Sequence, residues 1–180
     1  MRSITYHLII LLLTLSVLSA CRNNDPQEKN YSSKDLKEPL IEANRHVVKT
    51  ENQHIEDLLR RYQWDMTETG SGLRYMVYKK GQGEKAVQGK VATIDYEVRL
   101  ITGDLVYSSS EDGRLSFVIG KGEVISGLEE GILFLNVGDK AKFIIPSHLA
   151  YGLVGDDDRI PGKASLIYDV TLLNLNDQIN

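Results

Sequence analysis

The sequence predicts an α+β fold: an antiparallel β-sheet, curved into a half-barrel, wraps around one short helix and follows an N-terminal helix. Three observations predict it. Apolar residues recur every three or four positions before Gly70 and every second position after it. A single short helical pattern, beginning at Ser126, interrupts the predicted strands. The 180 residues are 42% hydrophobic and 26% charged, which is ordinary for one folded domain with additional segments.

The composition excludes several classes of protein. One cysteine cannot form an intramolecular disulfide, and with 4 histidines it leaves little material for a thiolate metal cluster. The formal net charge is -4, from 21 Lys and Arg against 25 Asp and Glu. Because binding to phosphates needs clustered basic residues, nucleic acid is not expected as a partner.

The first twenty residues are a predicted targeting signal. Arg2 precedes a mostly apolar stretch, residues 8–18, which is too short to cross a bilayer as a stable helix. The segment Leu18-Ser19-Ala20-Cys21 resembles the lipobox of bacterial lipoproteins. The resemblance implies that residues 1–20 are removed and that Cys21 carries acyl chains, two or more of which anchor a protein stably. The alternative is that Cys21 is incidental and lies near an ordinary secretory cleavage site.

A tether and a helix are expected before the β-rich region. Residues 21–38 contain Pro26 and many polar residues without apolar periodicity, as in a solvated linker. Arg22 differs from the Asp that retains some lipoproteins in the inner membrane, so the resemblance implies the outer membrane, facing the periplasm. A helix is predicted from Pro39 to Arg61, within a helical segment of residues 39–69. Its apolar stripe either docks against its own domain or mediates self-association.

Residues 70–180 are predicted to form one β-rich domain. Within residues 92–100, apolar and charged side chains alternate, so one face of that strand is buried and the other is wet. The predicted strands are 73–78, 92–100, 105–107, 115–119, 142–145 and 166–173.

The one short helix is predicted to begin with a capping box. The box is Ser126-Gly127-Leu128-Glu129, whose Ser and Glu satisfy two unpaired N–H groups. Leu128, Ile132 and Leu135 form its predicted inward stripe, and Gly138 is its predicted end.

From residue 94 to 176, the order and spacing of several segments resemble the FKBP-type peptidyl-prolyl isomerase domain. The segments are Asp95-Tyr96, Thr102-Gly103, Ser108-Ser109, Phe117-Val118-Ile119-Gly120, Gly122-Glu123-Val124-Ile125, Val137-Gly138-Asp139-Lys140-Ala141, Ala150-Tyr151-Gly152, Ile160-Pro161 and Leu166-Ile167-Tyr168-Asp169. Together with the lipobox, the helix and Gly72-Leu73-Arg74-Tyr75, they make the chain similar to the FKBP-type lipoproteins of Bacteroidota, some of which are associated with gliding motility. The resemblance implies isomerisation of X-Pro bonds without a cofactor or a metal.

The resemblance also implies a substrate pocket. The backbone N–H of Ile125 would hold a substrate carbonyl, the Tyr151 hydroxyl would bind a flanking peptide group, and Tyr96, Phe117 and Tyr168 would form an aromatic wall. The pocket is expected to comprise Tyr96, Val106, Leu115, Phe117, Val124, Ile125, Leu128, Tyr151, Ile160 and Tyr168. For its aliphatic members, plain core packing is the alternative, and Val124 or Ile160 taken singly favours it.

Three positions depart from the family pattern. Val106-Tyr107 replace an aromatic residue followed by Asp, which places Tyr107 at the pocket rim. Leu128 stands where the pocket floor often has Trp. Arg159 replaces an apolar residue beside Asp156-Asp157-Asp158, which are expected to be a solvated loop tip. A calcium site there is the alternative, although the other positions of an EF-hand loop are absent.

The leading hypothesis is a lipid-anchored prolyl isomerase that assists the folding of exported envelope proteins and binds their proline-containing segments. The second is a non-catalytic binding module of an envelope gliding or secretion complex, motivated by Val106-Tyr107 and the helix over 39–61. A third, an unrelated enzyme using His148, Asp156 and Glu129, lacks a recognisable pair of nucleophile and base.

Overall fold

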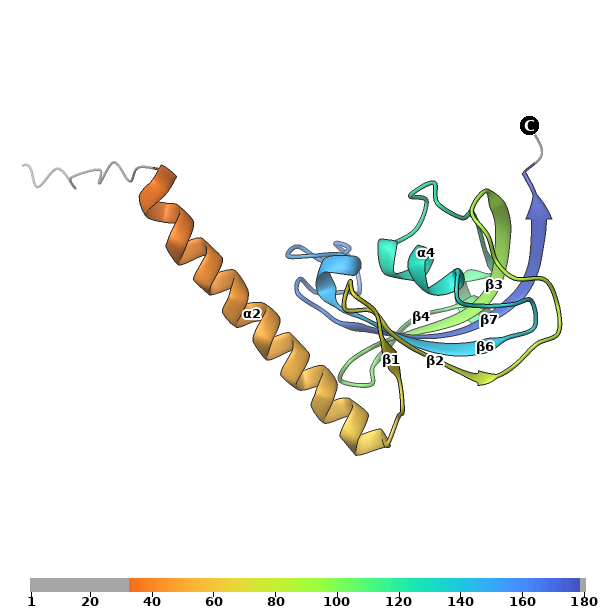
Figure 1. Ribbon diagram of the computed structural model, residues 1–180, viewed down its shortest axis with the longest axis horizontal. Helices are drawn as coiled ribbons and strands as arrows, with labels where there is room; N and C mark the ends of the chain where they lie inside the picture. The colour runs from red at the N-terminus through yellow and green to blue at the C-terminus, as the bar shows by residue number, and fades with distance from the viewer. Residues whose placement is uncertain (1–32, 179–180) are drawn as a thin grey trace, which may run out of the picture. The chain divides into compact units, whose positions relative to one another are not determined.

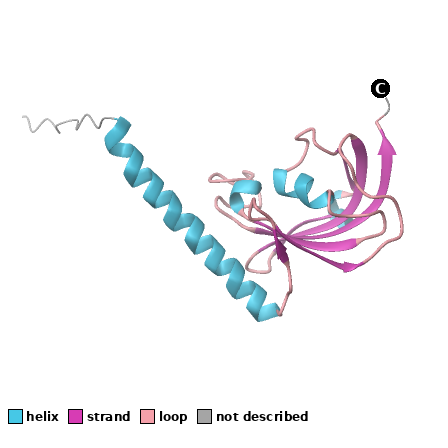
Figure 2. Ribbon diagram, viewed as in Figure 1, coloured by secondary structure: helices cyan, strands magenta, loops and turns pink. Residues whose placement is uncertain are grey.

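A computed structural model describes residues 33–178 (Figures 1 and 2). Residues Glu42–Asn180 form a compact unit of their own, and the packing below concerns that unit. The elements are α2 (Ser33–Tyr62), β1 (Thr67–Glu68), β2 (Arg74–Lys79), β3 (Lys90–Leu100), β4 (Leu105–Ser108), α3 (Ser109–Asp112), β5 (Leu115–Val118), α4 (Ser126–Ile132), β6 (Lys140–Ile145), the 3-10 helix η1 (Ser147–Leu149) and β7 (Leu166–Asp177). Within residues 33–178, no helix is both long and apolar enough to span a membrane.

Helix α2 begins at Ser33, not at the predicted Pro39, and ends at Tyr62. Pro39 lies inside the helix, where it lacks the N–H that would bond to the carbonyl one turn earlier. The helix therefore extends into the segment predicted as tether. Cys21, the signal and the rest of the tether lie outside the described residues.

The C-terminal half of α2 packs on one face of the sheet. Ile55 and Leu58 are buried together with Ile144 of β6 and Ile167 of β7. Burial of a side chain of this size stabilises the fold by roughly 1.5–3 kcal/mol. This half of the stripe therefore docks against its own domain, one of the two predicted arrangements, whereas Val48 is exposed.

All strands belong to one antiparallel sheet with the order β1-β2-β6-β7-β3-β4, and β5 also pairs with β3 (Figure 1). The last strand, β7, is central: it pairs with β3 from Lys90 to Leu100 and with β6 on its other side. The predicted α+β class and the six predicted strands are confirmed, with shifted bounds. The sequence did not predict β1, α3 or η1.

Helix α4 covers the opposite face of the sheet from α2. Leu128 and Ile132 are essentially fully buried there, which confirms that part of the predicted inward stripe, whereas Leu135 is buried in the same core cluster but follows the helix. The predicted end at Gly138 is wrong, because the helix stops at Ile132. Gly138 instead adopts φ +91° in the turn that leads to β6.

The predicted capping box is also wrong. Ile125 is the N-cap residue, and the helix start has no side-chain cap. The Ser126 hydroxyl donates to the carbonyl of Leu149 at 3.3 Å, and the Glu129 carboxylate accepts the N–H of Gly122 at 2.8 Å. Both side chains therefore bind neighbouring loops in place of the helix terminus.

Candidate active site

A cavity of about 270 Å³ opens between α4 and the sheet. Its lining residues come from β3, β4, β5, β7, the segment before α4, α4 itself and the turn after η1. They are Tyr96, Val98, Tyr107, Leu115, Glu123, Val124, Ile125, Leu128, Tyr151 and Tyr168.

The strand register explains part of this lining. Val98 of β3 lies opposite Tyr168 of β7 on one side and opposite Tyr107 of β4 on the other. Directly opposed residues of neighbouring strands point to the same face, so these three form a row across the cavity. Tyr96 precedes Val98 by two positions and therefore shares that face.

The structure brings most of the predicted pocket residues together. Eight of them line the cavity: Tyr96, Tyr107, Leu115, Val124, Ile125, Leu128, Tyr151 and Tyr168. Val106, Phe117 and Ile160 do not line it, and are buried in the core cluster. On β3, Leu115 pairs with Ile94 and Phe117 pairs with Ala92. Ala92 is farther from Tyr96 along the strand than Ile94 is. Phe117 therefore lies on the same face of β5 as Leu115 but farther from Tyr96, and its place in an aromatic wall stays a prediction.

Two lining residues, Val98 and Glu123, were missed. Val98 alternates with charged residues like any core position of β3, so only its pairing with two tyrosines distinguishes it. Glu123 is exposed at the cavity mouth, and its carboxylate accepts the N–H of Val118 at 2.8 Å. No sequence signal separates it from other surface glutamates.

The cavity tyrosines remain neutral donors. Burial raises the pKa of Tyr168, and the nearby Tyr151 and Tyr96 raise it further. Burial also raises the pKa of Tyr151, with a smaller contribution from the charge of Asp156. In the described part of the chain, every fully buried side-chain polar atom has a hydrogen-bond partner. A protonated phenol in this cavity can donate a hydrogen bond to a peptide carbonyl.

The backbone at Ile125 presents a second donor. Its φ of -58° and ψ of 143° are extended, and its carbonyl accepts the N–H groups of Leu128 and Glu129 at 3.0 and 3.2 Å. Among residues 33–178, no acceptor is paired with the N–H of Ile125 itself. Buried N–H groups are nearly always paired, so an unpaired one beside a cavity is available to a ligand.

A hydrogen bond from Tyr107 connects the loop after η1 to β4 at the rim of the cavity. Its hydroxyl donates to Oδ2 of Asp156 at 2.5 Å, while Oδ1 accepts the N–H groups of Asp158 and Ile160 at 3.0 and 2.7 Å. Burial raises the pKa of Asp156, but these hydrogen bonds outweigh it and lower the pKa below its ordinary value. The hydrogen bond to Asp156 is also the main reason that the pKa of Tyr107 is raised.

Arg159 joins the same rim. Its guanidinium lies 5.1 Å from the centre of the Tyr107 ring, and Nη1 donates to the carbonyl of Val106 at 2.8 Å. Asp157 and Asp158 are exposed as expected, whereas Asp156 is a structural hydrogen-bond acceptor. Within residues 33–178, no three His, Cys, Asp or Glu side chains are grouped to hold a metal ion.

The cavity has the features needed to remove a small apolar ring from water. Its walls are mainly aliphatic and aromatic, and the N–H of Ile125 and the hydroxyl of Tyr151 are donors at its surface. A rotation about a peptide bond requires no nucleophile and no proton transfer, only an environment that favours the twisted amide.

Comparisons with known proteins agree with this geometry. Residues 82–173, just over half of the chain, match the family described as FKBP-type peptidyl-prolyl cis-trans isomerase. A protein named probable FKBP-type peptidyl-prolyl cis-trans isomerase FkpA, from Neisseria meningitidis, is 39% identical over 108 residues, which are 59% of this chain and 39% of the relative. FK506-binding protein 2 of Dictyostelium discoideum is 43% identical over 93 residues, which are 51% of this chain and 70% of the relative.

Solved structures of similar proteins share the fold of this chain. The crystal structure of FkpA from Escherichia coli superposes with a TM-score of 0.64 at 27% identity, over 82% of this chain and 75% of that one. The crystal structure of AtFKBP13 superposes with a TM-score of 0.59 at 31% identity, over 62% of this chain and 98% of that one. The matched family model, the shared fold and the cavity together place the chain in a single group: it belongs to the FKBP-type peptidyl-prolyl cis-trans isomerase family.

Proposed function

We propose that this protein is a lipid-anchored peptidyl-prolyl cis-trans isomerase of the bacterial cell envelope that assists the folding of exported proteins. The observation that carries the catalytic part is a mainly apolar cavity with hydrogen-bond donors at its surface, in a chain of the FKBP-type family. The chain spans only 39% of the first relative, so the activity of the whole protein is part of the proposal.

The cavity would act by stabilising a twisted X-Pro bond. The planar amide loses its resonance during rotation, at a barrier of about 18–20 kcal/mol. A twisted amide has less charge separation than a planar one, so removing water from the prolyl ring favours the transition state over the ground state. Leu128 and Tyr168 would contact the ring, while the N–H of Ile125 and the hydroxyl of Tyr151 would hold the flanking carbonyls.

A protease-coupled assay with a proline-containing peptide tests the activity, and Tyr151→Phe tests the role of the hydroxyl. One neutral hydrogen bond contributes about 1 kcal/mol, so kcat/KM should fall roughly five-fold. Tyr75→Phe is the matched control, because Tyr75 stacks on Phe134 and does not line the cavity. No acceleration by the wild-type protein would refute the proposed activity, and equal rates for Tyr151→Phe and wild type would refute the role of the hydroxyl.

The anchoring part rests on the lipobox-like segment that ends at Cys21. Cys21→Ser should move the protein from the membrane fraction to the soluble fraction of the producing bacterium, because acyl chains require the thiol. The untouched chain is the reference. A Cys21→Ser variant that still sediments with membranes would refute the lipid anchor without affecting the isomerase proposal.

The rim favours a second candidate function, a non-catalytic module that binds proline segments within an envelope gliding or secretion complex. Tyr107 is hydrogen-bonded to Asp156 at the rim, where the resemblance leads us to expect a carboxylate instead of a phenol. Peptide binding with no acceleration of isomerisation would favour this candidate. A measurable kcat would favour the enzyme.

A further inference from the structure

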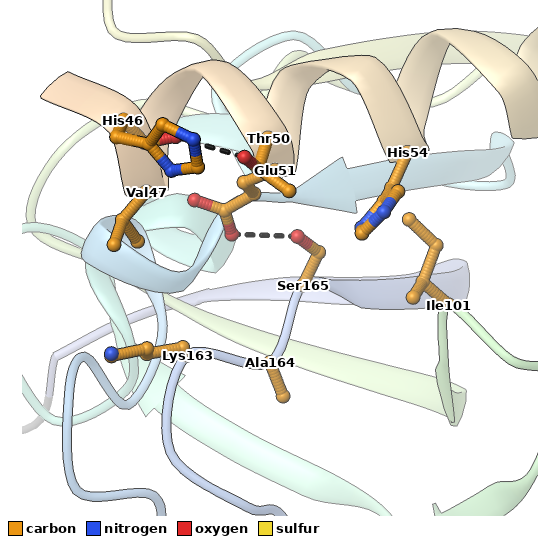
Figure 3. A pocket seen from close by; sticks show the side chains of 9 residues that line it. All are labelled: His46, Val47, Thr50, Glu51, His54, Ile101, Lys163, Ala164 and Ser165. Carbon is orange, nitrogen blue, oxygen red and sulfur yellow. Dashed lines mark hydrogen bonds between the residues drawn. The ribbon is translucent and has the colours of Figure 1, made fainter.

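One carboxylate of helix α2 reaches the stems of the loop that carries Tyr151. Oε1 of Glu51 accepts the backbone N–H of Ser147 and the hydroxyl of Ser165, each at 2.6 Å. Oε2 accepts the hydroxyl of Ser147 at 3.1 Å. Figure 3 shows Glu51 pointing from the helix toward Ser165, beside a second cavity of about 340 Å³ that also borders Lys163.

Ser147 and Ser165 mark the two ends of a single connection. Ser147 follows β6 and begins η1, while Ser165 directly precedes β7. The connection, residues 147–165, contains Tyr151 and the Asp156–Ile160 part of the rim. Two hydrogen bonds between backbone groups connect its inner portion. The N–H of Gly152 donates to the carbonyl of Ser147 at 2.8 Å, and the N–H of Lys163 donates to the carbonyl of Gly152 at 2.7 Å.

The carboxylate of Glu51 provides the acceptor for donors of two buried serines. Ser147 and Ser165 are both buried, so their donors would be left without an acceptor if the carboxylate were removed. Hydrogen bonds to a carboxylate are stronger than neutral ones, and three of them converge on Glu51.

The rest of α2 fixes the position of this carboxylate. Ile55 and Leu58 follow Glu51 by one and two helical turns and are buried against the sheet. Residues at this spacing share one face of a helix. The apolar contacts therefore hold the helix on the sheet, and Glu51 extends that attachment to the loop.

We infer that Glu51 is a positioning residue for the catalytic cavity: through Ser147 and Ser165 it holds both ends of the 147–165 connection and thereby sets the location of Tyr151. The inference rests on the proposed isomerase function for its kinetic consequence. It assigns helix α2 a part in the site although no residue of that helix lines the cavity.

Glu51→Ala in the full chain is the direct test, with Glu51→Gln as the conservative variant. Glu42→Ala is the matched control, because Glu42 is an exposed glutamate of the same helix whose one ion pair within the described residues is with Arg45. The readouts are kcat and KM for a proline-containing peptide and the hydrogen-exchange rates of amides in residues 147–165.

Glu51→Ala should lower kcat/KM about ten-fold, mainly through kcat, because a small displacement of a substrate-binding group weakens transition-state contacts. Amides of the 147–165 connection should exchange faster. Glu51→Gln should recover most of both, since its amide oxygen still accepts and its NH₂ group can donate to the Ser147 hydroxyl. Glu42→Ala should match the wild type.

The outcomes separate the inference from the proposed function. An inactive wild type refutes the isomerase proposal, and hydrogen exchange alone then decides whether Glu51 holds the connection. An active wild type, with Glu51→Ala indistinguishable from Glu42→Ala in kinetics and exchange, overturns the inference. If Glu51→Ala fails to fold, Ser165→Ala removes a single hydrogen bond. Unchanged exchange in residues 147–165 of that variant also overturns the inference.

Discussion

Replacing Gly127 with alanine tests how closely α4 packs on β6. A Cβ atom at this position would lie 2.4 Å from Cγ2 of Ile145 and 3.2 Å from the backbone oxygen of Leu149. Carbon atoms in contact are normally about 3.5–4.0 Å apart, so either the helix or the fully buried Ile145 must move by roughly 1 Å. The close packing of α4 on β6 therefore requires glycine, which has no Cβ atom, at position 127.

The expected cost follows from two opposing contributions. Overpacking of a core costs typically about 1–3 kcal/mol, and the severe contact places Gly127→Ala toward the upper end. Alanine is favoured over glycine in a helix by roughly 0.5–1 kcal/mol, which offsets part of that cost. The free energy of unfolding should therefore fall by about 2 kcal/mol, which for a domain of this size lowers Tm by roughly 4–8 °C.

Urea unfolding followed by the fluorescence of Trp64, the only tryptophan, measures this change. Gly70→Ala is the matched control, because nothing lies within 4 Å of its added Cβ. Loss of chain entropy in the unfolded state should leave that variant as stable as the wild type or slightly more so. Equal midpoints for Gly127→Ala and Gly70→Ala would show that the close approach of α4 to β6 is not as described.

Three further predictions concern the helix, the rim and its pH dependence. Ile55→Ala should lower the free energy of unfolding by about 3 kcal/mol through the cavity it leaves, and Val48→Ala, at an exposed position, by less than about 0.5 kcal/mol, in the same urea experiment. Tyr107→Phe should speed hydrogen exchange at the amide of Ile160, because Asp156 loses a donor that orders the loop; an unchanged rate would contradict this. The lowered pKa of Asp156 gives stability that is present above its ordinary pKa of 3.8 and lost as pH falls through the lowered value. Tyr107→Phe should therefore move the acid-unfolding midpoint to higher pH, and an unmoved midpoint would contradict this linkage.

Alternation of apolar and polar residues predicted strands that have one buried face, although β6 and β7 are buried on both faces. In β3, for example, Ile94 and Val98 are buried while Glu97 is exposed. The strand β1 has two exposed residues, and α3 and η1 have four and three residues. Elements this short contain about one period, so no pattern repeats within them that could predict them.

The boundaries of α2 and α4 were harder to predict for a different reason. Pro39 and Gly138 are local signals for a helix start and a helix end, and both were overridden. The long exposed helix tolerates Pro39 in its interior, and α4 ends at Ile132, before Gly138 is reached. Ser126 and Glu129 match a capping box in spacing, but their side chains bind the carbonyl of Leu149 and the N–H of Gly122 instead of the helix start.

The candidate site was predicted through its resemblance to a family and not through local pattern. Such a resemblance identifies which residues approach a pocket, but it did not identify Val98, whose place in the lining follows from its pairing with Tyr107 and Tyr168. The contact between Glu51 and Ser165 joins residues that are 114 positions apart. Only the folded chain brings that pair together.

The central position of β7 has a consequence for how the domain is made. Because β7 lies between β6 and β3, the two halves of the sheet have no common neighbour until residues Leu166–Asp177 are present. Before β7 is added, the chain can form α4 and the β3–β4 hairpin and can pair β5 with β3, but it cannot close the core. The core of the domain can therefore close only once β7 is in place. Pairings between distant segments also slow folding. A chain that ends before residue 166 should be recognised and degraded by cellular proteases, since it exposes the apolar edges of both halves.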